Sequence, residues 1–431
     1  MITHIRIDGF KSFREFSLDV PPTLLLLGPN GAGKSNLFDA LRLVAGTADW
    51  GFEATVRGDR RLSLANLFHR DSEKSRSQVL TIAIGALVAS QEGPLPICLQ
   101  LRVGRTPDGQ VAVLAKSAVW VSGPEDPGWM GQEGLDDEAQ LAVMRARAAF
   151  LERTGTDRVS FRGPLGTPWG LDTLKTAGEA GNEEGALEAG DELRALAARE
   201  CASWQPFVLD PDALRRPTAA LATGRLSPDG SNLAAVLHRV QDQAPKSWLR
   251  LVADVAALVD GVLDIRPLYD ERREEYDFEV EFSNTGWVSP PALSDGTLRM
   301  IALLAAAADP FWPGGMCVEE IENGMHPEHV ADLFRRLRRG AGVQAGSVPA
   351  YRQLVATTHS PALLAALRSE LTGSLVFLEQ ADRVDPQIPA VSRTTVARPL
   401  REFDPDRAPG ETVSPAHVER MLRKLGRGLA S

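Results

Sequence analysis

Apolar and polar residues alternate over the first twenty residues, which is the pattern of strands with one buried face. Ile5 and Ile7 are separated by a polar residue, and Phe16, Leu18 and Val20 repeat the spacing. Two short strands are therefore predicted in this segment.

Four consecutive leucines at residues 24–27 follow a Pro-Pro break and predict a buried strand. This strand runs into a glycine-rich turn, after which Leu37, Phe38, Leu41 and Val44 recur at helical spacing. A strand, a glycine turn and a helix are thus predicted in that order.

The middle of the chain shows weaker patterns. Residues 79–120 read as antiparallel strands with a turn at residues 107–109. Residues 121–134 are rich in Gly, Pro and acidic residues and read as a loop, whereas residues 135–153 and 186–200 read as helices. No heptad repeat is sustained, so a long coiled-coil arm is not expected.

Helix and strand alternate in the C-terminal half. A helix is predicted after the turn at residues 228–230, strands lead up to residues 278–282, and the alternation continues to about residue 396. The predicted regions are an N-terminal lobe with the glycine turn (1–120), a helical insertion (121–204), a C-terminal lobe (205–400) and a tail helix (401–431).

Composition narrows the function classes. Of the 431 residues, 43% are apolar, which is enough for a sizeable core. The 47 basic and 57 acidic residues give a net charge of −10, which argues against a general nucleic-acid coat but leaves a local basic face open. Cys98, Cys201 and Cys317 form neither a disulfide framework nor zinc spacing, so a cytoplasmic location is expected. The first residues do not read as a signal peptide, and no apolar run is long enough to span a bilayer, so no membrane association is expected.

Residues 28–35 read GPNGAGKS and fit the phosphate-binding pattern GxxxxGKS/T in full. Its glycines let backbone N–H groups curl around phosphate oxygens at a helix N-terminus. Lys34 would reach the β- and γ-phosphates, and the Ser35 hydroxyl would bind Mg²⁺. The alternative is a chance glycine turn, but the preceding strand and the following helix supply the context that the motif requires. The expected phosphate-binding residues are Asn30, Gly31, Ala32, Gly33, Lys34, Ser35 and Asn36.

A second motif is an apolar run at residues 316–318 that ends in the paired carboxylates of Glu319 and Glu320. A nucleotide site needs one carboxylate for the Mg²⁺ shell and another to polarise the attacking water. Taken alone, the pattern favours a strand followed by a solvated acidic turn. Together with a complete P-loop, it favours a catalytic pair.

Two weaker motifs follow the same order along the chain. Residues 293–299 read LSDGTLR before an apolar helix, so Ser294 is either an ordinary N-cap or part of an anion site. His359 ends the strand-like run at residues 353–358, where a histidine could reach a γ-phosphate, although a lone histidine is more often structural. The order and spacing of all four motifs favour the nucleotide interpretation.

On these motifs the chain resembles the ABC-type ATPases of the SMC, RecF and OLD (overcoming-lysogenization-defect) group. It is most similar to the compact bacterial members that are often encoded in defence or repair operons. The resemblance covers residues 1–50 and 205–380 well and the middle poorly. It rests on Phe10 to Phe13, Gly28 to Asn36, Asp229 to Leu233, Leu293 to Thr297, Glu319 to Glu328 and Thr358 to Pro361.

The resemblance implies an α/β P-loop NTPase fold, an ABC/SMC-type head with N-terminal antiparallel strands and a helical insertion. It implies ATP and Mg²⁺ as ligands and a homodimer that sandwiches ATP between its subunits. Ser294 and Gly296 would form the signature motif, which contacts the γ-phosphate bound by the other subunit. Lys11 would lie near the nucleotide.

In the same resemblance Glu319 is the Walker B carboxylate that holds Mg²⁺ with Ser35, Glu320 is the catalytic base and His359 is the switch histidine. His326 would lie in a segment that crosses the dimer interface. Many relatives have Asp where this chain has Glu319, and Glu322 is a rival base. Gln78 is a weak candidate for the Q-loop glutamine.

Other features are less specific. The residues after His359 show no carboxylate set of a TOPRIM nuclease domain, and residues 376–379 read as a last core strand. From Ser414 onward an amphipathic helix is predicted to dock on the ATPase core. Two basic runs could contact DNA phosphates, although a solvated helix face is the favoured interpretation for each. The runs comprise Arg335, Arg336, Arg338 and Arg339, and Arg57, Arg60, Arg61, Arg70, Lys74 and Arg76.

These observations predict an ATP-hydrolysing, nucleotide-dependent dimeric switch that acts in phage defence or DNA repair with a protein effector encoded nearby. DNA is a further candidate partner. The alternative is a slow-turnover scaffold or sensor that holds a toxin or nuclease and has no direct role on DNA. A transporter subunit fits less well, because the N-terminal strand pair and the large insertion resemble transporter ATPases poorly.

Overall fold

The computed structural model describes most of the chain outside the predicted insertion. The helix predicted over residues 135–153, apart from Arg145, and the turn at residues 107–109 lie outside the described part. The described residues are 1–70, 76–106, 110–120, 145, 159–161, 174–176, 195–201, 203–222, 224–312, 314–339, 341–344, 350–371, 373–384, 391–400 and 412–428.

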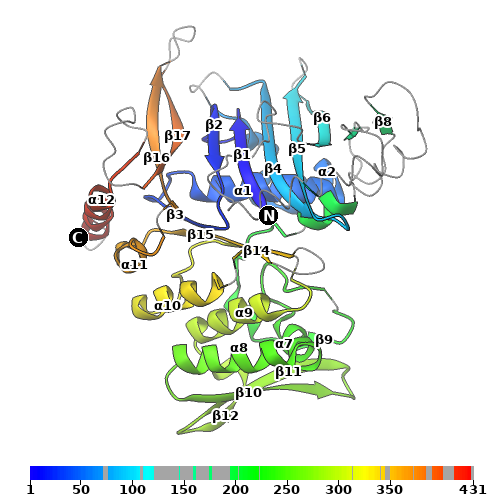
Figure 1. The fold of residues 1–431 in the computed structure, drawn as a ribbon, viewed down its shortest axis with the longest axis vertical. Helices are drawn as coiled ribbons and strands as arrows, with labels where there is room; N and C mark the ends of the chain where they lie inside the picture. The colour runs from blue at the N-terminus through cyan, green and yellow to red at the C-terminus, as the bar shows by residue number, and fades with distance from the viewer. Residues whose placement is uncertain are drawn as a thin grey trace.

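An antiparallel sheet with the strand order β2-β1-β4-β5-β6-β7-β8 forms one layer of the upper body in Figure 1. Ile5 pairs with Leu18 on one side and with Ile84 on the other, so the apolar positions of three strands share one face. This confirms the predicted N-terminal antiparallel strands. The strands are β1 (Ile2–Asp8), β2 (Phe16–Asp19), β4 (Val79–Ala89), β5 (Pro94–Arg105), β6 (Val111–Trp120), β7 (Val159–Phe161) and β8 (Leu174–Thr176).

The last two strands of this sheet correct one prediction. β7 and β8 lie within residues 121–204, which were predicted to be a helical insertion, yet they extend the sheet beyond β6. Only residues 195–200 of the second predicted helix are described, and they are helical, as is Cys201. The insertion therefore contributes strands as well as a helix, because the edge of β6 offers unpaired backbone groups to a following segment.

A second sheet has the order β13-β15-β3-β16-β17, with β14 on β15. The P-loop strand β3 is parallel to β15 and β16 and lies between them, and α1 (Lys34–Trp50) follows it. β16 was predicted to be the last core strand, but β17 follows it and pairs with it in an antiparallel hairpin. The strands are β3 (Thr23–Leu27), β13 (Gly315–Val318), β14 (Gly342–Gln344), β15 (Ala350–Thr358), β16 (Leu375–Val384) and β17 (Val391–Pro399).

The four leucines of β3 explain how the layers join. Leu24 and Leu26 belong to the core under the first sheet, whereas Leu25 and Leu27 belong to the core on the other side. Successive side chains of a strand point to opposite faces, so a strand buried on both faces reads as a continuous apolar run. All four side chains are fully buried.

The lower body in Figure 1 is built from helices and a small sheet, β10-β11-β12, with β9 on β11. Its helices α7 and α8 pack against the sheet on one side and against α9 on the other. The elements are α6 (Pro211–Leu214), β9 (Thr218–Ala219), α7 (Leu233–Gln243), α8 (Pro245–Leu258), β10 (Val262–Asp270), β11 (Glu275–Phe282), β12 (Gly286–Val288) and α9 (Asp295–Ala308).

Further helices cover the second sheet. The predicted C-terminal helix begins at Pro415 and buries Val418 against the core next to α11, so it docks on its own chain as predicted. No helix in the described part of the chain is long and apolar enough to cross a membrane. The remaining helices are α2 (Phe52–Gly58), α3 (Leu64–Leu67), α10 (Pro327–Leu337), α11 (Pro361–Leu367) and α12 (Pro415–Gly428).

Candidate active site

The P-loop joins the end of β3 to the start of α1. Gly31 and Gly33 have φ angles of 79° and 104°, a backbone conformation that favours glycine. A Cβ on Gly33 would lie 2.3 Å from the Thr395 hydroxyl of β17, so no larger residue fits there. Thr395 also donates a hydrogen bond to the Ala32 carbonyl at 2.9 Å, and Gln380 of β16 donates to the Gly31 carbonyl at 2.8 Å. The C-terminal hairpin therefore holds the loop in shape.

The Lys34 ammonium is the cation at the centre of the site. It donates hydrogen bonds to the carbonyls of Gly28 at 2.5 Å and Pro29 at 3.1 Å. Burial lowers the pKa of Lys34 below its ordinary value, and the charges of Glu320, Glu322 and Glu319, in that order, oppose this. The fold therefore brings three carboxylates of the acidic motif within electrostatic reach of the P-loop lysine.

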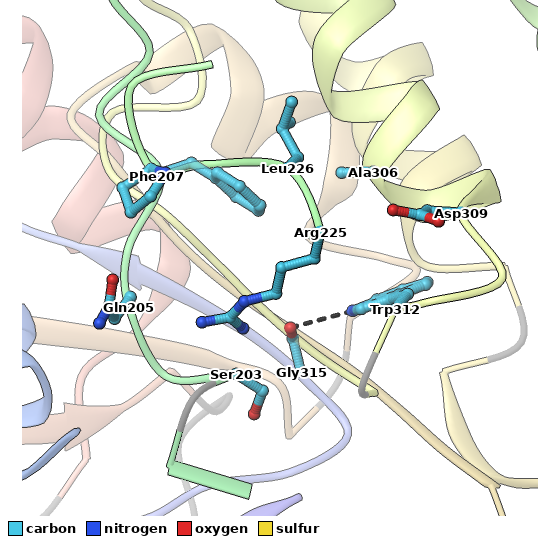
Figure 2. A pocket seen from close by; sticks show the side chains of 10 residues that line it. Ser203, Gln205, Phe207, Arg225, Leu226, Ala306, Asp309, Trp312 and Gly315 are labelled. Atoms are coloured by element: carbon cyan, nitrogen blue, oxygen red, sulfur yellow. Dashed lines mark hydrogen bonds between the residues drawn. The ribbon is translucent and has the colours of Figure 1, made fainter. Parts of the chain in front are cut away.

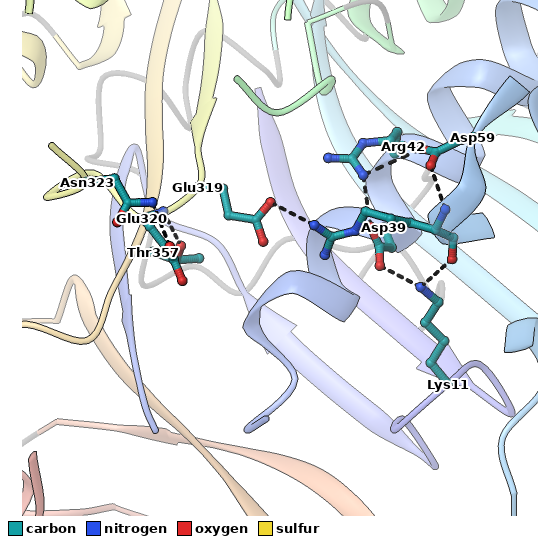
Figure 3. Close-up of polar contacts among 9 residues, drawn as sticks. Lys11, Asp39, Arg42, Asp59, Glu319, Glu320, Asn323 and Thr357 are labelled. Atoms are coloured by element: carbon teal, nitrogen blue, oxygen red, sulfur yellow. Dashed lines mark hydrogen bonds and ion pairs between the residues drawn. The ribbon is translucent and has the colours of Figure 1, made fainter. Parts of the chain in front are cut away.

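Glu320 has an unusual backbone. Its φ of 48° lies in the left-handed region, where residues with a Cβ are strained, and such strain clusters at functional sites. Its backbone N–H donates to the Thr357 hydroxyl at 2.8 Å, and the Asn323 amide donates to its carboxylate at 2.7 Å (Figure 3). The first contact fixes the Glu320 backbone, and the second holds its carboxylate.

Glu319 lies beside a separate charged network. An Arg61 guanidinium nitrogen is 3.4 Å from its carboxylate, and the Arg61 Nε is 3.0 Å from Asp39 of α1. Asp39 is buried, and Lys11 and Arg42 also pair with it, at 2.5 Å and 3.0 Å (Figure 3). Glu319 and Glu320 thus have different partners, which is the division that two tasks require.

Lys11 was predicted to lie near the nucleotide. Its ammonium contacts Asp39 and the Arg61 carbonyl, and no described hydrogen bond joins it to the P-loop. It nevertheless lines the same open cleft of about 550 Å³ as Ser12 and Asn36, the residue that follows Ser35. The walls of this cleft are largely basic, with Arg60, Arg61, Arg70 and Arg393 among them.

His359 meets Glu322 at the end of β15. One oxygen of the Glu322 carboxylate accepts a hydrogen bond from the His359 backbone N–H at 2.8 Å and lies 3.1 Å from the ring Nδ1. Glu322 is 13% exposed, whereas the His359 ring is 45% exposed. The Glu322 carboxylate therefore holds the His359 ring on one side.

Ser294 and Gly296 lie at the start of α9. The Ser294 hydroxyl accepts from the Thr297 N–H at 3.1 Å and caps the helix, as the ordinary N-cap interpretation predicts. Ser294 is exposed and has no described contact with the P-loop. A Cβ on Gly296 would lie 2.3 Å from the Gly324 carbonyl. The turn at residues 294–296, called the signature-like turn below, therefore packs directly on the turn that follows Glu320.

Two other predicted residues stay at the surface. Gln78 is exposed and bonds the carbonyl of its neighbour Arg76, so it is not part of the described site. His326 is the N-cap of α10, and its side chain is 66% exposed.

Sequence reasoning missed several supporting residues, namely Asp39, Asn323, Thr357, Gln380 and Thr395. Asp39 lies four residues after Ser35, on the same face of the P-loop helix, and this helical spacing is the one signal that could have found it.

One basic run is neutralised in the structure. Arg335 of α10 and Arg338, the C-cap of that helix, pair with Glu370, each at 2.7 Å. Arg336 and Arg339 pair with Asp254 of α8, at 2.9 Å and 3.0 Å. These ion pairs tie α10 to its neighbours, so this run does not offer a free basic face. In the other run, Lys74 lies outside the described residues.

A second pocket, beside Gly315 at the start of β13, surrounds the Arg225 guanidinium (Figure 2). Its free volume of about 20 Å³ matches about one water molecule. It is therefore too small for a nucleotide.

The site fits Mg²⁺ bound together with a phosphate ligand. No group of three or more His, Cys, Asp or Glu in the described part of the chain is arranged to hold a metal by itself. Mg²⁺ commonly takes one or two protein oxygens and completes its shell with phosphate and water. A half-buried Ser35 hydroxyl and the Glu319 carboxylate match that donor set.

Known proteins match both ends of the chain. A family model described as "AAA domain, putative AbiEii toxin, Type IV TA system" matches residues 194–365, and one described as "AAA domain" matches residues 4–78. The chromosome partition protein Smc of Gloeobacter violaceus is 34% identical over 103 residues, which are 23% of this chain and 8% of that protein. The Smc protein of Methanocaldococcus jannaschii is 49% identical over 43 residues, which are 10% of this chain and 4% of that protein.

A solved structure extends the likeness to nearly the whole chain. The Smc head bound to the C-terminal winged-helix domain of ScpA superposes with a TM-score of 0.50 at 15% identity, over 93% of this chain and 98% of that one. At this identity the likeness shows the fold, which is the predicted ABC/SMC-type head. The matched segments span only a small fraction of the Smc proteins, and the RecF and OLD branches stay a prediction.

Proposed function

On this ABC/SMC-like P-loop ATPase fold, we propose that the chain binds ATP with Mg²⁺ at residues 28–36 and hydrolyses it. The observation that carries the proposal is the parallel order β13-β15-β3, which ends the strands before Glu319, His359 and the P-loop at the same edge of the sheet. Ser35 and Glu319 would hold Mg²⁺, which would offset the charge of the β- and γ-phosphates when bound.

Glu320 is the residue that would take a proton from the attacking water. Its backbone is strained, and the Asn323 amide holds one carboxylate oxygen. The other oxygen has no partner among the described residues and would be open to a water molecule. His359 would contact the γ-phosphate from the neighbouring strand end.

Ser294 and Gly296 would complete the site of a second copy of the chain. The exposed Ser294 hydroxyl stands at a helix N-terminus, where backbone N–H groups attract anions. Because it has no described contact with its own P-loop, a γ-phosphate held by a partner subunit is the ligand that we propose for it. ATP binding would then close the homodimer, and hydrolysis would reopen it.

The cellular role that we propose is a switch for a protein effector in phage defence or repair, in the cytoplasm. The description of the matching family as a type IV toxin–antitoxin component supports the defence side. The arginines at residues 335–339 are paired with acidic side chains, and this weakens the argument that they contact DNA. The alternative is a scaffold with slow turnover, which differs in its rate of hydrolysis and not in its site.

A comparison of Glu320→Gln with Glu319→Gln tests the proposal. Loss of a general base costs about 10²–10⁴-fold in rate. We expect Glu320→Gln to lose that much steady-state turnover and to retain ATP affinity, because Lys34, Ser35 and Glu319 remain. Glu319→Gln should instead weaken ATP binding in the presence of Mg²⁺. Turnover of Glu320→Gln near the wild-type rate would show that Glu320 is not the base.

A further inference from the structure

The turn after β13 is joined to the end of β15 by a short series of hydrogen bonds. The Glu320 N–H donates to the Thr357 hydroxyl at 2.8 Å, and the Ile321 N–H donates to the Thr357 carbonyl at 3.1 Å. The next link along the turn is the Glu322 carboxylate, which accepts from the His359 N–H. Three successive residues of one strand end therefore contact the neighbouring strand end.

The Glu322 carboxylate differs from that of Glu320 in what it can still bind. Its Oε1 faces both the backbone N–H and the ring Nδ1 of His359. Its Oε2 is buried and has no hydrogen-bond partner among the described residues. A general base needs an oxygen that a water molecule can reach. Glu322 has its accessible oxygen engaged and its other oxygen shielded from solvent.

We propose that Glu322 is the positioning residue of His359, which rests on the nucleotide site proposed above. A carboxylate accepts hydrogen bonds, so contact with Nδ1 places a proton on that nitrogen. The ring is then fixed with Nε2 directed away from Glu322, and Nε2 is the atom left for the nucleotide. Glu322 acts through the histidine and takes no proton from water.

Substitution of Glu322 by Ala and by Gln separates the two roles. Glutamine keeps a side-chain oxygen that accepts from the His359 N–H, whereas alanine removes the acceptor. Misplacement of a group in the site can cost about 10²-fold in rate. We expect Glu322→Ala to lose about that factor in kcat, and Glu322→Gln to keep most of the activity, with ATP affinity little changed in both. Equal loss in both variants would indicate a base and would overturn the proposal.

A double substitution gives the second readout. If Glu322 acts through His359, Glu322→Ala should cost little more in a His359→Gln background, because the residue it positions is already gone. Additive losses would overturn the proposal. Glu370→Gln is the matched control, since Glu370 is a carboxylate in the arginine cluster of α10 and should leave turnover unchanged.

A readout without turnover keeps this inference separate from the proposed ATPase. The ring ¹⁵N signals of His359, assigned with His359→Gln, should show a proton on Nδ1 in the wild-type chain and a changed ring state in Glu322→Ala. Identical ring spectra in a folded Glu322→Ala variant would overturn the positioning role. A wild-type chain that hydrolyses no ATP would contradict the proposed function, and the ring spectra would still decide this proposal.

Discussion

At the scale of single residues, the buried Lys34 ammonium lies within electrostatic reach of the carboxylates of Glu319, Glu320 and Glu322. Lys34 is 6% exposed and is held over the carbonyls of Gly28 and Pro29, so its charge is directed into the loop. Removal of water strengthens its interactions with the neighbouring glutamates and with any bound phosphate. Such a lysine contributes more to binding than a surface lysine does.

Lys34→Ala should therefore lose ATP binding. Truncation of one partner of a buried charge pair costs about 2–5 kcal/mol, which is about 30-fold to several thousand-fold in Kd. Titration calorimetry with ATP and Mg²⁺ measures the loss. Lys246→Ala removes an exposed lysine of α8 and is the matched control, with unchanged affinity. An unchanged Kd in Lys34→Ala would remove the P-loop from the proposed site.

At the scale of elements, a buried ion pair fixes the lower body. Arg239 of α7 donates two hydrogen bonds to Asp309 at the end of α9, at 3.0 Å and 2.7 Å, and both side chains are buried. Its guanidinium also lies 4.6 Å from the centre of the Phe311 ring. Because α9 begins at Ser294, this pair anchors the far end of the helix that carries the signature-like turn.

Arg239→Met should destabilise the chain markedly, since it leaves the Asp309 carboxylate buried without its partner. The expected loss is about 3–5 kcal/mol in the free energy of unfolding by urea. Arg266→Met, which breaks the exposed pair with Glu279, should cost about 1 kcal/mol or less and serves as the control. Equal losses in the free energy of unfolding of the two variants would show that the buried pair stabilises the chain no more than the exposed pair does.

At the scale of the whole molecule, Ser294 has no described contact with the P-loop of its own chain. Lys34, Glu320 and His359 belong to the sheet around β3, whereas Ser294 belongs to the lower body and faces solvent. A second copy of the chain could bring its Ser294 to the P-loop. Formation of the proposed dimer therefore requires both bound ATP and the signature-like turn.

Ser294→Arg should retain ATP binding and lose ATP-dependent dimerisation, because the side chain would block the contact across the interface. Ser294→Asp should behave in the same way, since aspartate still caps α9 but repels the γ-phosphate. Ser294→Asn keeps the cap without charge and is the milder comparison. Light scattering with ATP, in a Glu320→Gln background to slow hydrolysis, measures the mass. Dimers of wild-type yield in the Arg and Asp variants would contradict the signature role.

The sequence alone determined the parts of this protein that are local. The P-loop is eight contiguous residues, and its glycines, lysine and serine act through a turn whose geometry they set themselves. The strands of the N-terminal sheet followed from a period of two, and the leucines of β3 followed from burial on both faces. Nearby residues along the chain carry all of this information.

Only the tertiary structure decided which charges meet. Lys11 pairs with Asp39, Asn323 holds Glu320, and Glu322 holds His359, a residue 37 positions away along the chain. The arginines at residues 335–339 read as a basic run, yet Asp254 of α8 and Glu370, which follows α11, neutralise them. The sequence pattern shows which residues carry charge. The parallel order β13-β15-β3-β16 decides which of them lie at neighbouring strand ends, and no local spacing in the sequence encodes this order.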